Sequence, residues 1–336
     1  VVPVAGHHAL HLGSHLGEAG RRPCKAMAGL RLLLLMQTLL LASADFCDDF
    51  DVSQLDGSDP LDYCKAQFMM GHPPKIGTVC LARPQDAFPT QAAYGEVDAG
   101  CVQREIEALA GEKDGSLRTY LMSNTVPTVI GPSGKLYITD HHHLSRALLQ
   151  SFLPYDKPYI HRLLYLCINE DLSKYDEQGF WDEMQSRQLV WLYDNEGNNI
   201  TVHDLPQSVK YLKDDPYRTL AMYVRQSYGF IKCGSKSANS KFPQCEGGNV
   251  TAKPYIEFKW AKLYRAQFPL PDIYDQSDQA QVIQLQSVLG QAITISLDPR
   301  NAGQEGFNRL GPKSAQQVTL DDHGCVAEDD KKKKKK

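Results

Sequence analysis

Residues 126–148 read VPTVIGPSGKLYITDHHHLSRAL, and this stretch decides the fold class. Two β-prone runs, 126–130 and 135–139, flank the turn Gly131-Pro132-Ser133-Gly134, which is the pattern of a β-hairpin. A helix is expected to begin at Asp140, because aspartate is a favourable N-cap residue. The stretch therefore predicts two paired strands that lead directly into a helix.

The expected helix over 140–151 gathers histidines and an arginine near its first turn. Its apolar stripe consists of Leu144, Ala147 and Leu148. On the opposite face, His142 and Arg146 are four residues apart, and His143 lies beside Arg146. The free N–H groups of the first turn favour an anion there, while the imidazoles suit proton transfer or metal binding. The alternative is that Asp140 only caps the helix and that the histidines form a solvated first turn.

The remaining elements interleave along the chain. Strands are expected at 76–81, 161–168 and 190–193, and helices at 98–112, 180–188, 216–228, 254–267 and 277–291. The strands are short and are joined by turns. This pattern favours an α+β fold with a short mixed sheet and surrounding helices over a doubly wound parallel sheet.

Both ends of the chain differ from the middle. Residues 1–26 are expected to be translated upstream sequence, and residues 331–336, six lysines, a translated poly-A tract; a basic binding arm is the alternative for the lysines. Residues 27–44 have the pattern of a secretory signal peptide, with an apolar run shorter than the roughly 20 residues of a membrane span. The mature protein is therefore expected to be secreted and not to associate with a membrane. Within it, residues 45–74 form a cysteine-containing leader, 75–275 the main domain and 276–330 a helical C-terminal extension.

The expected mature stretch, 45–330, is acidic and rich in cysteine. It carries 26 Lys and Arg against 39 Asp and Glu, a net charge of −13, which disfavours long nucleic acids as partners. Its eight cysteines are an even number, which is typical of disulfides in an oxidising compartment. Cys233 and Cys245 bracket a Gly/Ser/Asn-rich loop and are expected to pair. Asn199 and Asn249 stand in Asn-x-Thr sequons and are expected to be glycosylated.

The segment from 131 to 148 resembles the ParB-like nuclease family of the ParB/sulfiredoxin superfamily. The shared features are the Gly-Pro-x-Gly-x-x-Tyr turn at 131–137, the Asp-x-His-His helix start at 140–143 and the Arg-Ala-Leu at 146–148. Further similar blocks follow in order at 180–184, 192–194, 205–206, 214–221 and 257–261. The resemblance covers roughly 72–270, so that 75–275 would be a ParB-like domain.

The resemblance implies a ParB/sulfiredoxin-like fold with a nucleotide phosphate at the strand–helix junction over 138–146. Histidines stand where sulfiredoxins have Gly-Cys, so cysteine-based sulfinic acid repair is not implied. A basic helix-turn-helix segment is also lacking, so chromosome partitioning is not implied either. By analogy with the family blocks, Asp215, Arg218 and Lys259 would bind substrate, and Glu257 would act as general base or orient an imidazole.

Three hypotheses follow for the function. The first is a secreted hydrolase acting on a phosphate ester or a small nucleotide-like substrate. In it, His141 and Arg146 bind the anion, His142 or His143 acts as acid/base, and Asp140 orients an imidazole. The second is a secreted, non-catalytic protein that binds an anionic ligand. The third is a metal-dependent oxidoreductase or lyase in which His142 and His143 bind a divalent metal.

Overall fold

The hairpin and the helix that follows it are present in the computed structural model. Strands β4 (Val126–Ile130) and β5 (Leu136–Ile138) pair antiparallel, as predicted, and α4 (His142–Gln150) begins shortly after β5. Gly131 opens the turn because a Cβ there would approach the ring of Tyr137 to 2.5 Å. The structure describes residues 47, 49–112, 115–153, 158–233, 241–245, 254–270, 278–321 and 323–326. The predictions for residues 1–44, Asn249 and 331–336 lie outside these residues.

A mixed five-stranded sheet confirms the α+β fold. Its strand order is β1-β6-β4-β5-β2, and a separate two-stranded sheet pairs β3 with β7. The strands not yet given are β1 (Val79–Ala82), β2 (Phe88–Pro89), β3 (Ala93–Tyr94), β6 (Leu164–Asp171) and β7 (Lys213–Asp214). β4 runs parallel to β6 and antiparallel to β5, while the outer pairs are antiparallel (β1 with β6) and parallel (β2 with β5), so the sheet is mixed throughout.

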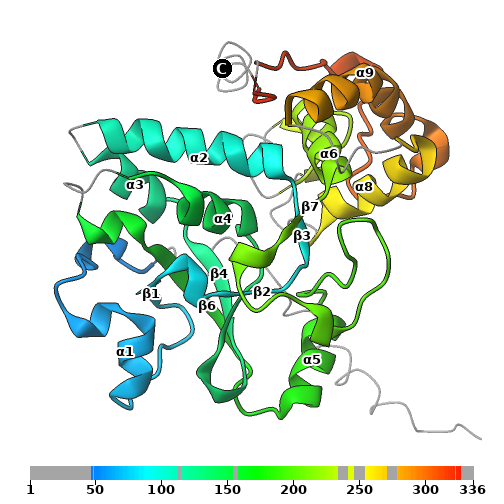
Figure 1. Ribbon diagram of the computed structural model, residues 1–336. Coiled ribbons are helices and arrows are strands. Elements are labelled where there is room, and N and C mark those ends of the chain that lie inside the picture. The colour runs from blue at the N-terminus through cyan, green and yellow to red at the C-terminus, as the bar shows by residue number, and fades with distance from the viewer. Residues whose placement is uncertain are drawn as a thin grey trace, which may run out of the picture. The chain divides into compact units, whose positions relative to one another are not determined.

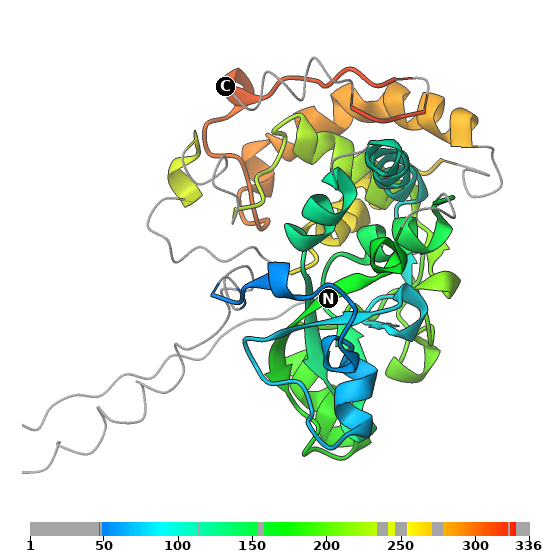
Figure 2. The same cartoon turned by 90° about the vertical axis from the view of Figure 1, so that its left-hand side faces the viewer.

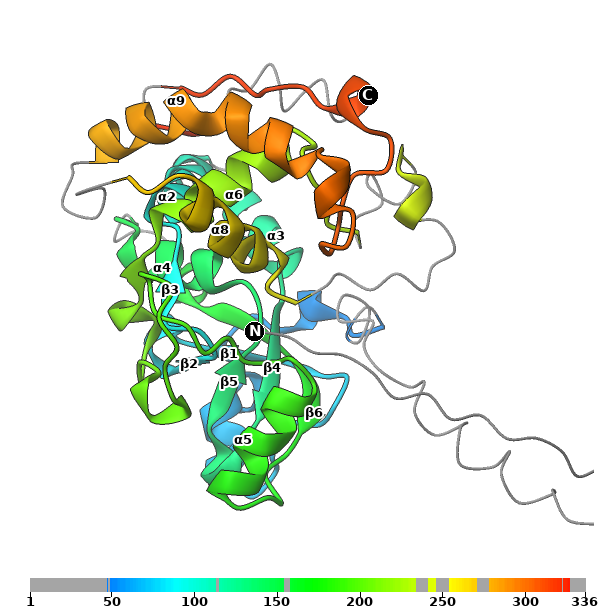
Figure 3. The same cartoon turned by 90° about the vertical axis from the view of Figure 1, so that its right-hand side faces the viewer.

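Most of the helices pack in two groups beside the strands. The helices of the described residues are α1 (Cys64–Met69), α2 (Glu96–Gly111), α3 (Ser116–Met122), α4, α5 (Glu177–Ser186), α6 (Pro216–Gln226), α8 (Ile256–Gln267) and α9 (Asp278–Ser296). Helices α2 and α4 lie side by side and share a core with β1, β4 and β6 (Figure 1). Helices α6, α8 and α9 pack together around a second core (Figure 3).

An aromatic core explains two of the sequence blocks of the resemblance. Tyr137 of β5 lies 4.7 Å from Phe180 and 5.2 Å from Trp181, measured between ring centroids. Phe180 is fully buried, and both residues come from α5. The block at the turn and the block at 180–184 therefore meet in space, and their shared role is packing.

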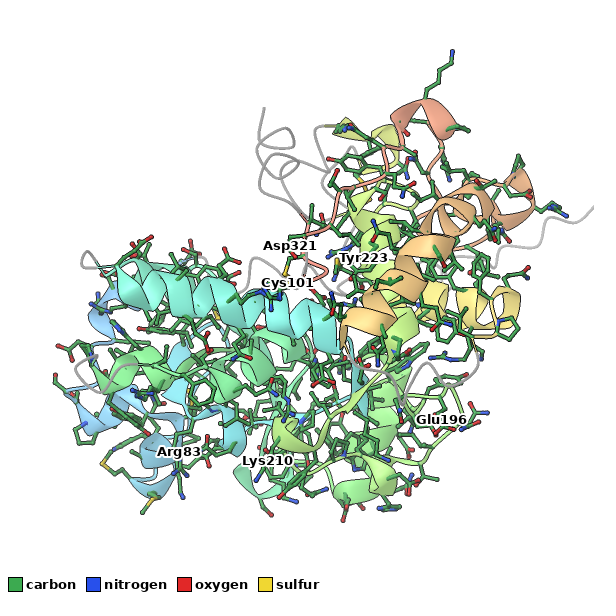
Figure 4. The ribbon with its side chains drawn as sticks, turned by 45° about the horizontal axis from the view of Figure 1, so that its top comes forward. Arg83, Cys101, Glu196, Lys210, Tyr223 and Asp321 are labelled. Carbon is green, nitrogen blue, oxygen red and sulfur yellow. A yellow bond between two sulfur atoms is a disulfide. The ribbon has the colours of Figure 1, made fainter. Side chains whose placement is uncertain are left out.

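Disulfides tie distant parts of the fold together. The four bonds are Cys47–Cys167, Cys64–Cys80, Cys101–Cys325 and Cys233–Cys245. The last is the pair that the sequence predicts. The first two attach the N-terminal segment with α1 to the sheet (Figure 2). The third joins α2 to the C-terminal segment, and Figure 4 shows Cys101 near Tyr223 and Asp321.

One local prediction is wrong. Residues 190–193 form only isolated bridges, in which Trp191 pairs with Gln91 and Tyr193 with Asn199, because Trp191 stacks on Tyr255 and Phe258. The described part of the segment 45–74, expected to be a cysteine-containing leader, contains α1, contributes to the main core and is joined to β6 and β1 by Cys47 and Cys64. No helix in the described part of the chain combines the length and the apolar character needed to cross a bilayer.

Candidate functional site

Helix α4 begins in an unusual way. Its N-cap residue is His141, with φ +60° and no side-chain hydrogen bond to the helix, so the prediction that Asp140 is the N-cap is wrong. Asp140 instead accepts a 2.7 Å hydrogen bond at Oδ1 from the N–H of His141. A left-handed backbone costs a residue other than glycine roughly 1–2 kcal/mol. Surrounding structure must therefore hold His141 in place.

His142 is a buried part of the core side of α4. Only 2% of its surface is exposed, and its Nε2 accepts a hydrogen bond of 3.2 Å from the N–H of Thr90. Because a backbone N–H can only donate, Nε2 carries no proton and the neutral ring keeps its proton on Nδ1. Burial lowers the pKa of His142 to about 3. The expectation that His142 lies opposite the buried stripe is wrong, because the side chain is itself buried against the segment that contains Thr90.

His143 makes an equivalent contact with α2. Its Nε2 accepts a hydrogen bond of 2.9 Å from the N–H of Gly95, the residue that precedes α2, and lies 3.7 Å from Oδ2 of Asp98. Burial lowers the pKa of His143 to about 4, although Asp98 opposes the shift. Gly95 is needed here because a Cβ would come within 2.7 Å of Oγ1 of Thr219. Both imidazoles are thus neutral hydrogen-bonded groups at pH 7.

Arg218 extends from α6 toward the same carboxylate. Its Nη1 lies 3.6 Å from Oδ2 of Asp98, and its guanidinium lies 5.6 Å from the ring centroid of Phe258. The residue is 7% exposed, and its Nε and Nη1 have no hydrogen-bond partner. A buried guanidinium without acceptors for its donors is costly. The site therefore contains donors that a ligand with oxygen acceptors would satisfy.

A second charged group lies at the start of α8. Glu257 is 4% exposed, and its Oε1 lies 3.2 Å from Nη1 of Arg225 and 3.5 Å from Nζ of Lys232. The same Nζ lies 3.8 Å from Oδ2 of Asp140, whose side chain is 58% exposed. Burial alone would raise the pKa of Glu257, but Lys232 and Arg225 outweigh it and hold the pKa well below its usual range. Tyr255, which precedes α8, has φ +56° and thus repeats the geometry of His141.

These contacts define one group of charged and polar side chains, which we call the helix-start cluster. Its members are Asp98, Asp140, His142, His143, Arg218, Arg225, Lys232 and Glu257. They come from α2, α4, α6 and α8 and from adjoining segments. The three acidic and three basic members balance in charge when the histidines are neutral.

Asp215 has a structural position at the start of α6. Its Oδ1 accepts hydrogen bonds from the N–H groups of Tyr217 and Arg218, and Nη2 of Arg265 donates to the same oxygen at 2.6 Å. Burial raises the pKa of Asp215, although Arg265 opposes the shift. The predicted substrate-binding role of Asp215 is untested, and its contacts are those of a capping residue.

The other predicted site residues have contacts outside the helix-start cluster. Nη1 of Arg146 donates to the carbonyl of Lys210, and the guanidinium lies 5.6 Å from the ring centroid of Tyr94. Nζ of Lys259 donates to Glu305 at 2.7 Å. The side chain of His141 is half-buried. The structure thus brings Arg218 and Glu257 to the histidines, while Arg146 and Lys259 bind partners elsewhere.

The metal hypothesis has no three-residue ligand group within the described residues. No three His, Cys, Asp or Glu side chains there are arranged so that they could hold an ion. His142 and His143 each accept a backbone hydrogen bond at Nε2, which occupies the nitrogen that would coordinate. Metal binding by these histidines therefore stays a prediction from the sequence.

Sequence reasoning missed Asp98, Arg225 and Lys232. Asp98 and Arg225 lie in the helices that the periodicity predicts, but nothing in their local sequence separates them from surface charges. Lys232 is next to Cys233, whose pairing with Cys245 was predictable and fixes that end of the segment. Arg218 was identified only through the resemblance.

Comparisons with known proteins concern the domain and the fold. A family model described as "Putative ParB-like nuclease" matches residues 82–266, more than half of the chain. The fold is similar to the crystal structure of protein Atu1540 from Agrobacterium tumefaciens, with a TM-score of 0.51 and 23% identity. The similarity covers 68% of this chain and 95% of that one, and at this identity it concerns the fold alone. No curated protein matches the chain.

Proposed function

Because the chain belongs to the ParB-like nuclease family, we propose that it is a secreted enzyme that acts on a phosphate ester or a small nucleotide-like substrate at the helix-start cluster. The substrate is small because the net charge of −13 over residues 45–330 repels long nucleic acids. The observation that carries the proposal is the buried guanidinium of Arg218, whose Nε and Nη1 have no acceptor.

Arg218 is the group best suited to bind the phosphate. A guanidinium offers donors in a planar fork that matches two phosphate oxygens. The helix-start cluster is balanced in charge, so the affinity for an anion would come from unsatisfied donors rather than from net charge. Binding would also remove the desolvation cost of leaving Nε and Nη1 of Arg218 without hydrogen-bond acceptors.

The neutral ring of His143 is a second donor for the same anion. Its Nε2 lies 3.7 Å from the oxygen of Asp98 that Nη1 of Arg218 approaches to 3.6 Å, so the imidazole ring lies near the guanidinium. Since Nε2 accepts from Gly95, the Nδ1–H is the group that remains to donate. In this proposal His143 orients the phosphate and does not transfer a proton.

Asp140 is the carboxylate best placed to act on water. Its side chain is 58% exposed, whereas that of Glu257 is 5% exposed, and both approach Nζ of Lys232. The ammonium of Lys232 and the N–H of His141 hold the pKa of Asp140 below its usual range. Asp140 would therefore be ionised at neutral pH and would orient an attacking water by accepting its hydrogen bond.

The test is phosphate release from a panel of phosphate monoesters and nucleotides by the wild type and by Arg218→Lys. The lysine keeps the charge but loses the fork, so turnover should fall at least tenfold. Arg187→Lys is the matched control, because Arg187 pairs with Glu170 and Glu183, outside the helix-start cluster. Equal turnover by wild type and Arg218→Lys would refute the assignment.

A non-catalytic binding protein is the second candidate. One observation favours it: both imidazoles have a low pKa and a hydrogen-bonded Nε2, so neither is a base at neutral pH. Titration calorimetry with inorganic phosphate and nucleoside monophosphates separates the two candidates. Saturable binding that Arg218→Lys weakens, with no product after long incubation, would support the binding protein over the enzyme.

Secretion and glycosylation belong to the same proposal. Four disulfides support an oxidising compartment, and Asn199 is exposed. Expression of the full chain in a eukaryotic host should release protein that begins at Asp45 and loses mass on treatment with an N-glycosidase. Retention of the protein in the cytosol would contradict this part of the proposal.

A further inference from the structure

A groove lies at the opposite end of β5 from the helix-start cluster. It encloses about 750 Å³ between α1, the strands β1 and β2, and the turn that precedes β5. Its apolar lining includes Tyr63, Phe68, Met69, Leu81, Phe88 and Leu136. Small-molecule sites in proteins have volumes of about 300–1,000 Å³ and are mostly apolar. In size and lining the groove is of this kind.

Apolar side chains at the margin of the groove are exposed to solvent. Leu81 and Leu136 form buried parts of its wall, whereas Met69 is 78% and Tyr159 is 54% exposed at its margin. Contiguous exposed apolar surface of this kind marks binding sites more often than chance. A ligand with an apolar chain would cover it.

Cationic side chains border the same groove. Lys65, Arg83 and Lys135 line it together with the single acid Asp86. Arg83 donates to Asp86 at 2.7 Å, which leaves the two lysines. No ion pair involves Lys65 or Lys135 within the described residues, and Lys135 only lies 5.3 Å from the ring centroid of Phe88. The apolar wall is thus bordered by a surplus of positive charge.

The backbone at the groove argues against a peptide strand as the occupant. The free side of β1 already pairs with Tyr63 through a bridge to Leu81. The edge strand β2 ends in Pro89, which has no N–H to donate. Addition of a strand needs free backbone donors and acceptors, so a small molecule fits better.

We propose that this groove binds a single-chain amphiphile with one carboxylate, a ligand of the fatty-acid class. The chain lies against Phe68, Leu81 and Leu136, and the carboxylate lies between the ammonium groups of Lys65 and Lys135. Figure 4 shows Arg83, which borders the groove, well away from Tyr223 of α6. The site is therefore separate from the helix-start cluster and does not depend on the function proposed for it.

The test is titration calorimetry of the mature secreted protein with dodecanoate below its micelle concentration. Dodecanol and dodecyltrimethylammonium have the same chain with a neutral and a cationic head. Dodecanoate should bind with one-to-one stoichiometry and at least tenfold more tightly than either. Decanoate, with two fewer methylenes, should bind roughly tenfold more weakly than dodecanoate, because each buried methylene contributes about 0.8 kcal/mol.

Two variants locate the site. The double variant Lys65→Gln/Lys135→Gln should bind dodecanoate and dodecanol equally, while Lys313→Gln, at an exposed lysine that does not line the groove, should behave as the wild type. Ala66→Trp should block dodecanoate by filling the groove, with its fold checked by circular dichroism. Equal affinity of the wild type for all three head groups, no binding, or dodecanoate affinity unchanged in the lysine double variant would overturn the proposal.

Discussion

Helices α6 and α4 begin in opposite ways. The start of α6 follows the usual pattern, with Pro216 in the first turn and the carboxylate of Asp215 capping two N–H groups. The start of α4 has a left-handed His141 and no side-chain cap, and the start of α8 is like it. The conventional start is a stability element, whereas strained starts persist only where surrounding contacts hold them, which is common at functional sites. The two strained starts carry His142 and Glu257, both in the helix-start cluster.

The largest effect is expected at the conventional start. Asp215→Ala should lower the free energy of unfolding by about 3–5 kcal/mol, because it removes the cap and breaks a buried ion pair with Arg265. Urea denaturation measures the change. Asp176→Ala is the matched control, since Asp176 caps α5 through the N–H of Gly179, and should cost about 1 kcal/mol. Equal losses in the two variants would contradict the role given to the pair with Arg265.

The second-largest effect is expected for His142→Ala, which tests whether the start of α4 is also part of the core. His142→Ala should lower the free energy of unfolding by about 2–4 kcal/mol, because it leaves a cavity and an unsatisfied N–H at Thr90. The sequence alone predicts lost activity with an unchanged melting temperature. His203→Ala, at an exposed histidine, should change stability by less than about 0.5 kcal/mol. A melting temperature of His142→Ala equal to that of the wild type would show that the contact with Thr90 is unimportant.

A third prediction concerns pH. The folded-state pKa values of His142 and His143, about 3 and about 4, lie below the ordinary value of 6.5, so the unfolded chain binds more protons between pH 6.5 and 4. Stability is therefore greatest above pH 6.5 and falls on acidification, by up to roughly 1.4 kcal/mol per pH unit for each histidine. Denaturation at pH 7, 6 and 5 measures the slope.

The variant His143→Gln isolates one of these histidines. It should reduce the slope between pH 6.5 and 5 by up to roughly 1.4 kcal/mol per pH unit. Asp215 at the start of α6 has a raised pKa, because it is buried, and this shift acts in the opposite direction. A slope unchanged by His143→Gln would mean that this imidazole is protonated in the folded protein.

The smallest effect tests the strain itself. His141→Gly should raise the free energy of unfolding by about 1 kcal/mol, because glycine adopts φ +60° without a steric cost. Ser151→Gly, at the other end of α4 with φ −63°, relieves no strain and should be destabilising. Thermal unfolding of the two variants measures the difference. A destabilised His141→Gly would show that the His141 side chain contributes more than its backbone costs.

Much of the fold could be predicted because its signals are local. The hairpin depends on a Pro/Gly turn between two β-prone runs, and α6 on Asp215 followed by Pro216, and each signal acts within a few residues. The prediction of a strand at 190–193 is wrong because aromatic residues suit both strands and ring stacking. Here Trp191 stacks on Tyr255 and Phe258, which are more than 60 residues away in the chain. Residue type alone does not distinguish these two outcomes.

The candidate site was predictable only in part. Helical spacing joins His142 to Arg146, but the guanidinium that lies near the histidines is that of Arg218, which is 75 positions after His143 in the chain. Helical spacing also placed His142 opposite the apolar stripe, whereas the side chain is buried and accepts a hydrogen bond from Thr90. A helix has several faces, and periodicity identifies the apolar one without showing which polar residues a second helix will bury.

The sequence by itself determined the α+β class, the family, the hairpin with its helix, and the pairing of Cys233 with Cys245, since each depends on patterns a few residues long or on a family resemblance. Tertiary structure alone decided that Asp98 and Arg218 lie beside His143, that Lys232 pairs with Asp140 and Glu257, and that both imidazoles are neutral. The physical reason is that burial and charge pairing depend on which elements approach one another. Those approaches join residues far apart in the chain.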